Sequence, residues 1–210
     1  MRAEQMVRGL LAACVLAFTG TAAAAAPPPD VLVRDVTLEV LEIISRDKDI
    51  QSGDRAKIVA LIEAKVVPHF NFAGMAAQAM GANWRKANAE QKAKLTDAFK
   101  TLLVRTYASA LTAYRDQKFD FKPLRLKPED TDVTVHVKVV QPGAQAVTID
   151  YDMEKSPGGW KVYNVHVGGV SLVINYRTEF ANQVRDAGID GLIRNLETKN
   201  RSLADGRPRQ

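Results

Sequence analysis

The residues of this chain that could carry acid–base or metal chemistry are scattered over its length. The three histidines are His69, His136 and His166, and none has a partner at the HxxxH spacing that places two rings on one helix face. His136 and His166 fall in segments that read as strands, so a pair across neighbouring strands is one alternative to a structural or surface role. We expect the structural role, and therefore no metal site.

Nucleophilic and phosphate-binding motifs are also missing from the sequence. Ser171 lacks the second glycine of a GxSxG turn, and we expect its hydroxyl to cap the helix that follows. Asp150 and Asp152 share one side of a predicted strand, which is typical of a solvated sheet face. The chain has no phosphate-binding loop and no dinucleotide glycine pattern. These observations predict a protein that is not an enzyme.

The charge pattern argues against nucleic acid as a partner. The chain has 29 Lys and Arg against 24 Asp and Glu, a formal net charge of +5. On the predicted helices the basic residues alternate with acidic ones and are not interleaved with exposed aromatic residues. A mildly basic surface is compatible with anionic lipid headgroups, with an acidic protein partner, or with solubility alone.

The N-terminus has the three-part pattern of a secretory signal peptide, predicted over residues 1–25. Arg2 and Arg8 precede a short apolar run over 9–18, and small residues follow over 21–26. The run is too short to cross a bilayer, which takes about 20 apolar residues. Residues 11–14 resemble a lipobox ending at Cys14, but the apolar run continues past it, so we expect no lipoprotein. Without Cys14 the mature chain has no cysteine and no disulfide.

Apolar residues at three- and four-residue steps predict helices in the first half of the chain. Asp30 is expected to cap the first, over 30–45, and Asp54 the second, which Pro68 ends. A short helix follows over 72–80. Asn88 is expected to cap a long helix to about Arg115, roughly 42 Å in length at 1.5 Å per residue.

The periodicity then changes to two, which predicts strands. The expected segments are 118–124, 133–140, 147–152 and 160–167, and tight turns join the last three. Helices return over 170–187 and after Gly188. The predicted fold class is α+β: a curved antiparallel sheet of about four strands with helices packed over one face. We expect a single domain over 26–200 and a disordered basic tail over 201–210.

Every predicted element has an apolar face. These faces either pack against one another and fill the core, or they enclose a cavity. A long helix across a curved sheet leaves a slot that suits apolar ligands. Tyr107, Tyr114, Tyr151 and Tyr176 could rim such a slot, each with an apolar ring and a polar tip.

Several motifs resemble one family, the MlaC/toluene-tolerance proteins. They are Gly158–Val165 (GGWKVYNV), Gly169–Arg177 (GVSLVINYR), Pro68–Ala76, Met80–Ala87 and Gly188–Ile193, spread over most of the chain. Two residues depart from the family pattern. Asn71 stands where FDF usually has Asp, and Asn164 stands where YDV usually has Asp.

The resemblance implies a periplasmic carrier that holds a phospholipid by its acyl chains, as cargo and without any cofactor. It implies a monomer that exchanges lipid with two partners: an inner-membrane ABC transporter complex with MCE-domain subunits, and an outer-membrane lipoprotein–porin complex. A carrier of hopanoid or another isoprenoid lipid, and a ligand-free scaffold between membrane complexes, remain alternatives.

The lipid-binding residues are expected on the long helix, the strands and the strand–helix corner after Gly169, because the family motifs occupy these elements. The predicted set is Tyr107, Leu111, Val147, Ile149, Tyr151, Val165, Val167, Leu172 and Tyr176.

Overall fold

The computed structural model describes residues 26–112 and 117–205, without the side chains of 109–112. The predicted signal peptide, Tyr114 and the side chain of Leu111 therefore lie outside the described part of the chain. The α-helices are α1 (Pro29–Arg46), α2 (Lys48–Gln51), α3 (Arg55–Lys65), α4 (Phe72–Met80), α5 (Ala89–Thr112) and α6 (Arg177–Ala204). Short 3₁₀ helices are η1 (Val67–His69), η2 (Gly81–Lys86) and η3 (Ile174–Tyr176).

The strands form one antiparallel sheet in the order β1-β2-β3-β4-β5. They are β1 (Lys118–Phe121), β2 (Asp132–Val140), β3 (Val147–Ser156), β4 (Gly159–Val167) and β5 (Val170–Ser171). Each strand pairs with the next along the chain; short turns join β2 to β5, and a longer loop over 122–131 joins β1 to β2. The α+β class and the antiparallel meander are confirmed, and the sheet has one strand more than about four because the chain doubles back at β5.

Side-chain caps fix most helix starts where the sequence placed them. The carboxylate of Asp54 accepts hydrogen bonds from two backbone N–H groups of α3. Asn88 and Gln91 form a reciprocal capping box before α5, with distances of 2.8 and 3.1 Å. Asp30 is not a cap, however: α1 already begins at Pro29, and the Asp30 carboxylate accepts the backbone N–H of Leu124 at 3.2 Å. Proline supplies the start by its fixed φ.

The corner after Gly169 differs from the predicted helix over 170–187. Gly168 and Gly169 have φ of 59° and 81°, in the left-handed region that favours glycine. The chain then pairs back as β5 before it turns, and α6 begins only at Arg177. The Ser171 hydroxyl accepts the backbone N–H of Ile174, the first residue of η3, at 2.9 Å, and no long helix starts there as the sequence had predicted.

A β-bulge in β4 changes which side chains face the helices. Met153 pairs with Val162, but the neighbouring Asp152 pairs with Asn164, so Tyr163 is an extra residue. The alternation expected from Trp160 to His166 is therefore interrupted after Val162. Val162 and Val165 share one face of the sheet, and Asn164 and His166 turn to the other.

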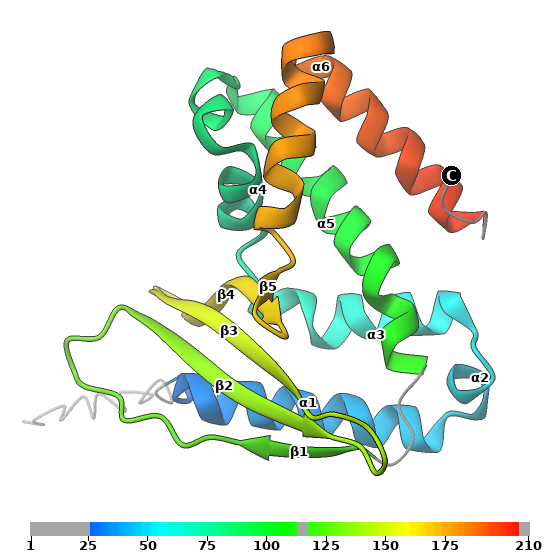
Figure 1. Cartoon of the computed structure of the whole chain (residues 1–210), viewed down its shortest axis with the longest axis vertical. Coiled ribbons are helices and arrows are strands. Elements are labelled where there is room, and N and C mark those ends of the chain that lie inside the picture. Colours follow the sequence, from blue (N-terminus) through cyan, green and yellow to red (C-terminus); the bar gives the residue numbers. More distant parts are fainter. Residues whose placement is uncertain (1–25, 113–116, 206–210) are drawn as a thin grey trace, which may run out of the picture.

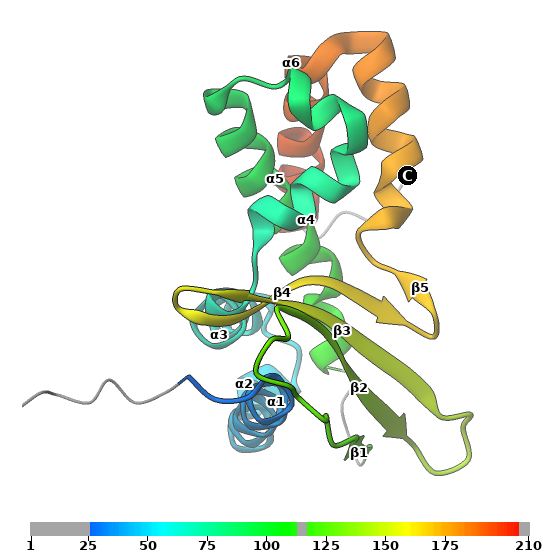
Figure 2. The same ribbon diagram turned by 90° about the vertical axis from the view of Figure 1, so that its left-hand side faces the viewer.

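The helices form two groups around the sheet (Figures 1 and 2). The first group, α1 with α2 and α3, lies against one face of the sheet, as expected. The second group, α4, the first half of α5 and α6, packs together beyond β4 and β5, which the sequence did not indicate. The long α5 runs from this second group down to α3 and belongs to both.

Three apolar clusters correspond to this arrangement. The bundle cluster joins α4, α5 and α6 around Phe99, Leu102 and Phe180. The second joins α1, α2, α3 and α5, and the third joins α1 to the sheet.

Helix α6 is interrupted at Gly188, where φ is 70° and ψ is 179°. The glycine break expected there is thus observed as a kink. The helix continues through Ala204, which corrects the prediction of a disordered tail for residues 201–204; residues 206–210 are not described.

Candidate functional site: an apolar cavity between the sheet and the helices

An apolar cavity of the described chain lies where the three apolar clusters meet. Its volume is about 450 Å³, within the range of about 300–1,000 Å³ that is usual for small-molecule sites. Val33, Val104 and Leu103 each belong to a different cluster and all three line it. The cavity is therefore a gap between packed units.

The helical walls are mostly apolar. Helix α1 contributes one face, with residues at the three- and four-residue steps of its apolar stripe: Leu32, Val33, Val36, Thr37, Val40 and Leu41. The end of α3 and the following η1 add Ile62, Val66, Val67 and His69. Phe70 lies just before α4, and α4 itself adds Phe72 and Met75. Three residues of α5 complete the helical side: Leu103, Val104 and Tyr107.

The sheet supplies the opposite wall. Alternate residues of β3 point into the cavity: Ile149, Tyr151 and Met153. Beside them, Val162 and Val165 come from β4, both on this face because of the bulge. Phe119, Val139 and Leu172 extend the wall toward β1, β2 and the corner.

No Lys, Arg, Asp or Glu is among the described residues that line the cavity, so an ionic group would find no partner of opposite charge there. Burial lowers the pKa of His69 from its ordinary value, and the nearby Lys161 ammonium lowers it further. His69 is therefore a neutral ring at physiological pH. Burial raises the pKa of Tyr151 to about 12, so its phenol is also neutral.

Five of the predicted site residues line the cavity: Tyr107, Ile149, Tyr151, Val165 and Leu172. Val147 and Val167 do not, because they lie at the ends of β3 and β4 and are 41% and 37% exposed. Tyr176 is also elsewhere: its ring packs against Phe99 and Phe180 in the bundle cluster. The side chain of Leu111 is outside the described part of the chain.

Sequence reasoning missed the α1 wall and the residues around Phe70. The stripe of α1 was recognised as an apolar face, but no local signal says whether such a face packs against atoms or borders a void. Phe70 reaches the cavity because the chain before α4 is tied to β4: the backbone N–H of Asn71 donates to the carbonyl of Val162 at 2.8 Å. That long-range bond has no signature in the sequence.

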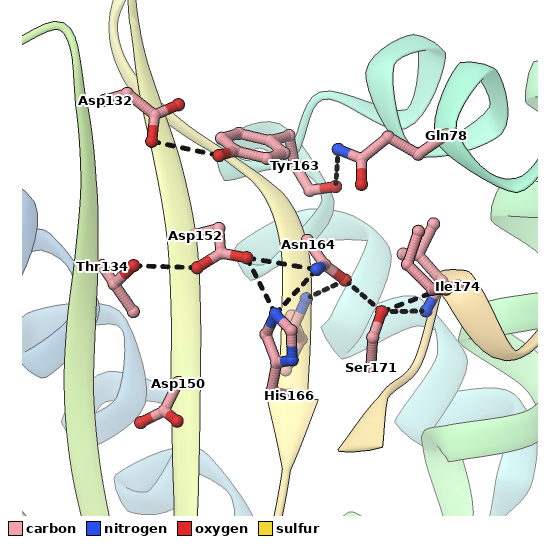
Figure 3. A network of polar contacts seen from close by, with 12 residues as sticks. Gln78, Asp132, Thr134, Asp150, Asp152, Tyr163, Asn164, His166, Ser171 and Ile174 are labelled. Atoms are coloured by element: carbon pink, nitrogen blue, oxygen red, sulfur yellow. Dashed lines mark hydrogen bonds and ion pairs between the residues drawn. The ribbon is translucent and has the colours of Figure 1, made fainter. Parts of the chain in front are cut away.

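The polar candidates of the sequence lie on the other face of the sheet, in a network that joins β2 to β5 (Figure 3). Asp152 accepts hydrogen bonds from Thr134 at 2.9 Å and from the Asn164 amide at 3.1 Å, and His166 Nε2 lies 2.8 Å from it. The Ser171 hydroxyl donates to Asn164 Oδ1 at 2.7 Å. The network fixes the corner, and none of its residues lines the apolar cavity.

The alternative of a His136–His166 pair is wrong. Strand β3 lies between β2 and β4, so each histidine meets an aspartate of β3. His136 Nδ1 is 2.8 Å from Asp150 Oδ1, and His166 contacts Asp152. Within the described residues, no group of three or more His, Cys, Asp and Glu side chains could hold a metal ion.

The two departures from the family motifs share one explanation. The amide of Asn71 donates to the Glu154 carboxylate, and the amide of Asn164 donates to the Asp152 carboxylate. Both carboxylates come from β3. An aspartate at either position would place two anionic groups in contact and would repel the carboxylate of β3. The asparagine present in this chain donates a hydrogen bond to that carboxylate instead.

No helix of the described segments is long and apolar enough to cross a membrane. The fold and the cavity together define an α+β protein with a preformed apolar site of the kind that takes hydrophobic small molecules. The family model described as MlaC protein matches residues 34–198. The chain belongs to the MlaC family.

Individual relatives agree with this assignment. The intermembrane phospholipid transport system binding protein MlaC of Haemophilus influenzae is 23% identical over 172 residues, 80% of each chain. The toluene tolerance protein ttg2D of Pseudomonas putida is 28% identical over 184 residues, 87% of this chain and 84% of its own. A phospholipid-binding protein of Ralstonia solanacearum, solved in complex with a phospholipid, is 37% identical with a TM-score of 0.78. That alignment covers 85% of this chain and 99% of the Ralstonia chain.

Proposed function

We propose that this protein is a non-catalytic carrier that binds a phospholipid by its acyl chains in the cavity between the sheet and the helices. The observation that carries the proposal is the apolar cavity itself, walled by aliphatic residues of α1, α3, α5, β3 and β4. A relative with the same fold was solved with a phospholipid bound, which supports the same ligand class here.

The physical need for a carrier follows from the hydrophobic effect. Two acyl chains contain roughly 30 methylenes, and each costs about 0.8 kcal/mol to expose to water. A free lipid therefore almost never crosses an aqueous gap. Transfer from a bilayer to an equally apolar cavity is nearly neutral, so loading and unloading need no chemical step.

We place this carrier in the periplasm, delivered by the signal peptide predicted for 1–25, where it would exchange lipid between the two membranes. The relative from Haemophilus influenzae is named as part of an intermembrane phospholipid transport system. By analogy, the partners proposed for this chain are the inner-membrane MCE-domain transporter complex and the outer-membrane lipoprotein–porin complex, with docking biasing an open state.

The test is whether the purified protein carries and takes up phospholipid. Protein without residues 1–25 should retain phospholipid through gel filtration, and mass spectrometry of an organic extract should identify it. Hopanoid or another isoprenoid lipid in the extract would change the ligand class. Protein that is always lipid-free and takes up no labelled phospholipid from vesicles would refute the carrier function.

A pair of variants on one helix sharpens this test. Val36 lines the cavity, whereas Leu38, two residues on, is 50% exposed. Val36→Glu places a carboxylate in the acyl-chain space and should lower bound lipid strongly, because an unpaired charge is costly there. Leu38→Glu makes the same substitution outside the cavity and should leave bound lipid unchanged. Equal loss in both variants would locate the lipid elsewhere.

A further inference from the structure

The hydroxyl of Tyr151 forms no hydrogen bond with the described residues and faces a cavity whose lining is mostly apolar. Tyr151 is in the middle of β3, directly opposite Val135 of β2 and Val165 of β4, so strands on both sides hold its backbone. Its side chain lines the cavity, and its oxygen has no hydrogen-bond partner among the described residues. The oxygen is not fully enclosed by protein atoms, because Asn200 Oδ1 is the only fully buried side-chain polar atom without a partner among the described residues, so a molecule in the cavity can reach it.

Other polar groups of the cavity differ from it. The Thr37 hydroxyl donates to the backbone carbonyl of Val33 at 2.7 Å and is satisfied within its own helix. The Gln117 amide donates to Gln141 Oε1 at 3.3 Å. Tyr107 offers a second phenol, but from α5 and not from the rigid sheet wall.

Tyr163 provides a comparison on the next strand. Its hydroxyl donates to the Asp132 carboxylate at 3.1 Å, on the other face of the sheet. The protein thus gives the outer phenol an acceptor of its own. The Tyr151 hydroxyl has no such acceptor among the described residues, which leaves it available to a molecule in the cavity.

The chemistry of that partner is restricted by the walls. Tyr151 is neutral at physiological pH, since burial raises its pKa to about 12, and it therefore needs an acceptor oxygen. A phosphate is a poor match, because no described Lys or Arg lines the cavity to neutralise it. Of the groups in a diacyl phospholipid, the uncharged acceptor next to the acyl chains is the ester carbonyl.

We propose that the Tyr151 hydroxyl donates a hydrogen bond to an ester carbonyl of the bound lipid and so makes the protein select ester-linked over ether-linked chains. This inference rests on the proposed phospholipid-carrier function. Ether-linked lipid has the same headgroup and chain length but lacks the carbonyl, and its binding leaves the phenol unpaired. The bond also sets how deep the chains enter, because it fixes the glycerol end at the level of Tyr151.

The experiment is a competition between two lipids in one vesicle. Vesicles contain equal amounts of dipalmitoyl phosphatidylethanolamine and its dihexadecyl ether analogue, and lipid bound to the re-isolated protein is quantified by mass spectrometry. The unmodified protein should enrich the ester lipid about three- to tenfold, the net worth of a neutral hydrogen bond. Tyr151→Phe keeps the ring and should bind both lipids in the vesicle ratio. Tyr163→Phe is the matched control and should enrich the ester lipid as the unmodified protein does.

The outcomes separate this inference from the carrier function. Binding of both lipids without enrichment by the unmodified protein would overturn the role of Tyr151 and leave the carrier function intact. So would enrichment that persists in Tyr151→Phe, or that is lost only in Tyr107→Phe. Failure of the unmodified protein to bind either lipid would overturn the carrier function and the inference with it.

Discussion

A tryptophan in place of Ile149 should fill the cavity from the sheet side without disturbing the packed core. Ile149 lines the cavity and is only partly buried. Its partner directly opposite on β2 is Val137, which is 2% exposed and does not line the cavity. The same indole introduced at these two paired positions therefore meets open space in one variant and close-packed atoms in the other.

The expected magnitudes differ in kind. In Ile149→Trp the side chain gains about six non-hydrogen atoms, which displace roughly three to six methylenes of a bound chain at about 0.8 kcal/mol each. The resulting loss of about 2–5 kcal/mol is an upper bound, because a chain can shift within about 450 Å³. At least a tenfold loss of lipid affinity is expected. In Val137→Trp the indole overpacks the core and should lower the free energy of unfolding by about 1–3 kcal/mol or more.

Two assays separate these effects. Chemical denaturation of lipid-free protein measures the free energy of unfolding, and extraction after incubation with vesicles measures bound phospholipid per folded protein. We expect Ile149→Trp to be as stable as the unmodified protein but lipid-poor. We expect Val137→Trp to be less stable, with normal lipid per folded molecule. If Ile149→Trp loses stability as Val137→Trp does and binds lipid normally, the cavity is not the lipid site.

Three further perturbations test other parts of the structure. Burial lowers the pKa of His69 below its ordinary 6.5, so below about pH 6.5 the unfolded chain binds more protons than the folded protein. The free energy of unfolding should therefore fall as the pH drops through that range. Melting curves from pH 8 to 5 should show a smaller fall for His69→Gln. Asn71→Asp should lower the free energy of unfolding by about 1 kcal/mol at neutral pH, because the new carboxylate repels Glu154. In a double-mutant cycle, Glu154→Gln should restore this loss of stability, and an equal loss in both backgrounds would contradict the contact. Gly169→Val should lower the free energy of unfolding by about 1–3 kcal/mol, because φ at this position is 81° and valine is strained there. The loss would come from the backbone alone, since a Cβ at this position meets no atom within 4 Å. An unchanged melting temperature would refute the strain.

Local patterns predicted the elements of this fold well because the physics that forms them is local. Helix α4 has the predicted bounds, between the Asn71 side chain, which accepts the Gly74 N–H, and the break at Gly81. The alternation in β2 and β3 likewise gave the strands and, with the short turns, their antiparallel order.

The sequence-based predictions fail where contacts between residues distant in the sequence determine the structure. The bulge at Tyr163 depends on how β4 registers against β3, and it reversed the faces of the residues after Val162. The same limit explains why Tyr176 was misplaced: its helical spacing is consistent with any apolar neighbour, and the partner turned out to be Phe99 in the bundle. The apolar stripe of α1 does not show whether it packs against other atoms or borders a cavity, because that depends on how three clusters pack together. The sequence of α1 alone therefore could not predict that it forms a wall of the cavity.

Helix α5 belongs to two packed clusters, and this limits how the shape of the cavity can change. Leu103 belongs to the cluster of α4, α5 and α6, and Val104, the next residue, belongs to the cluster of α1, α2 and α3, yet both line the cavity. The helix cannot move toward the sheet to close the void without pulling Phe99 and Leu102 out of the bundle, where both are fully buried. The packing of the bundle next to the cavity therefore opposes closure of the cavity. We therefore expect the cavity to keep its shape when a bound lipid leaves, because the bundle of α4, α5 and α6 holds α5 in place.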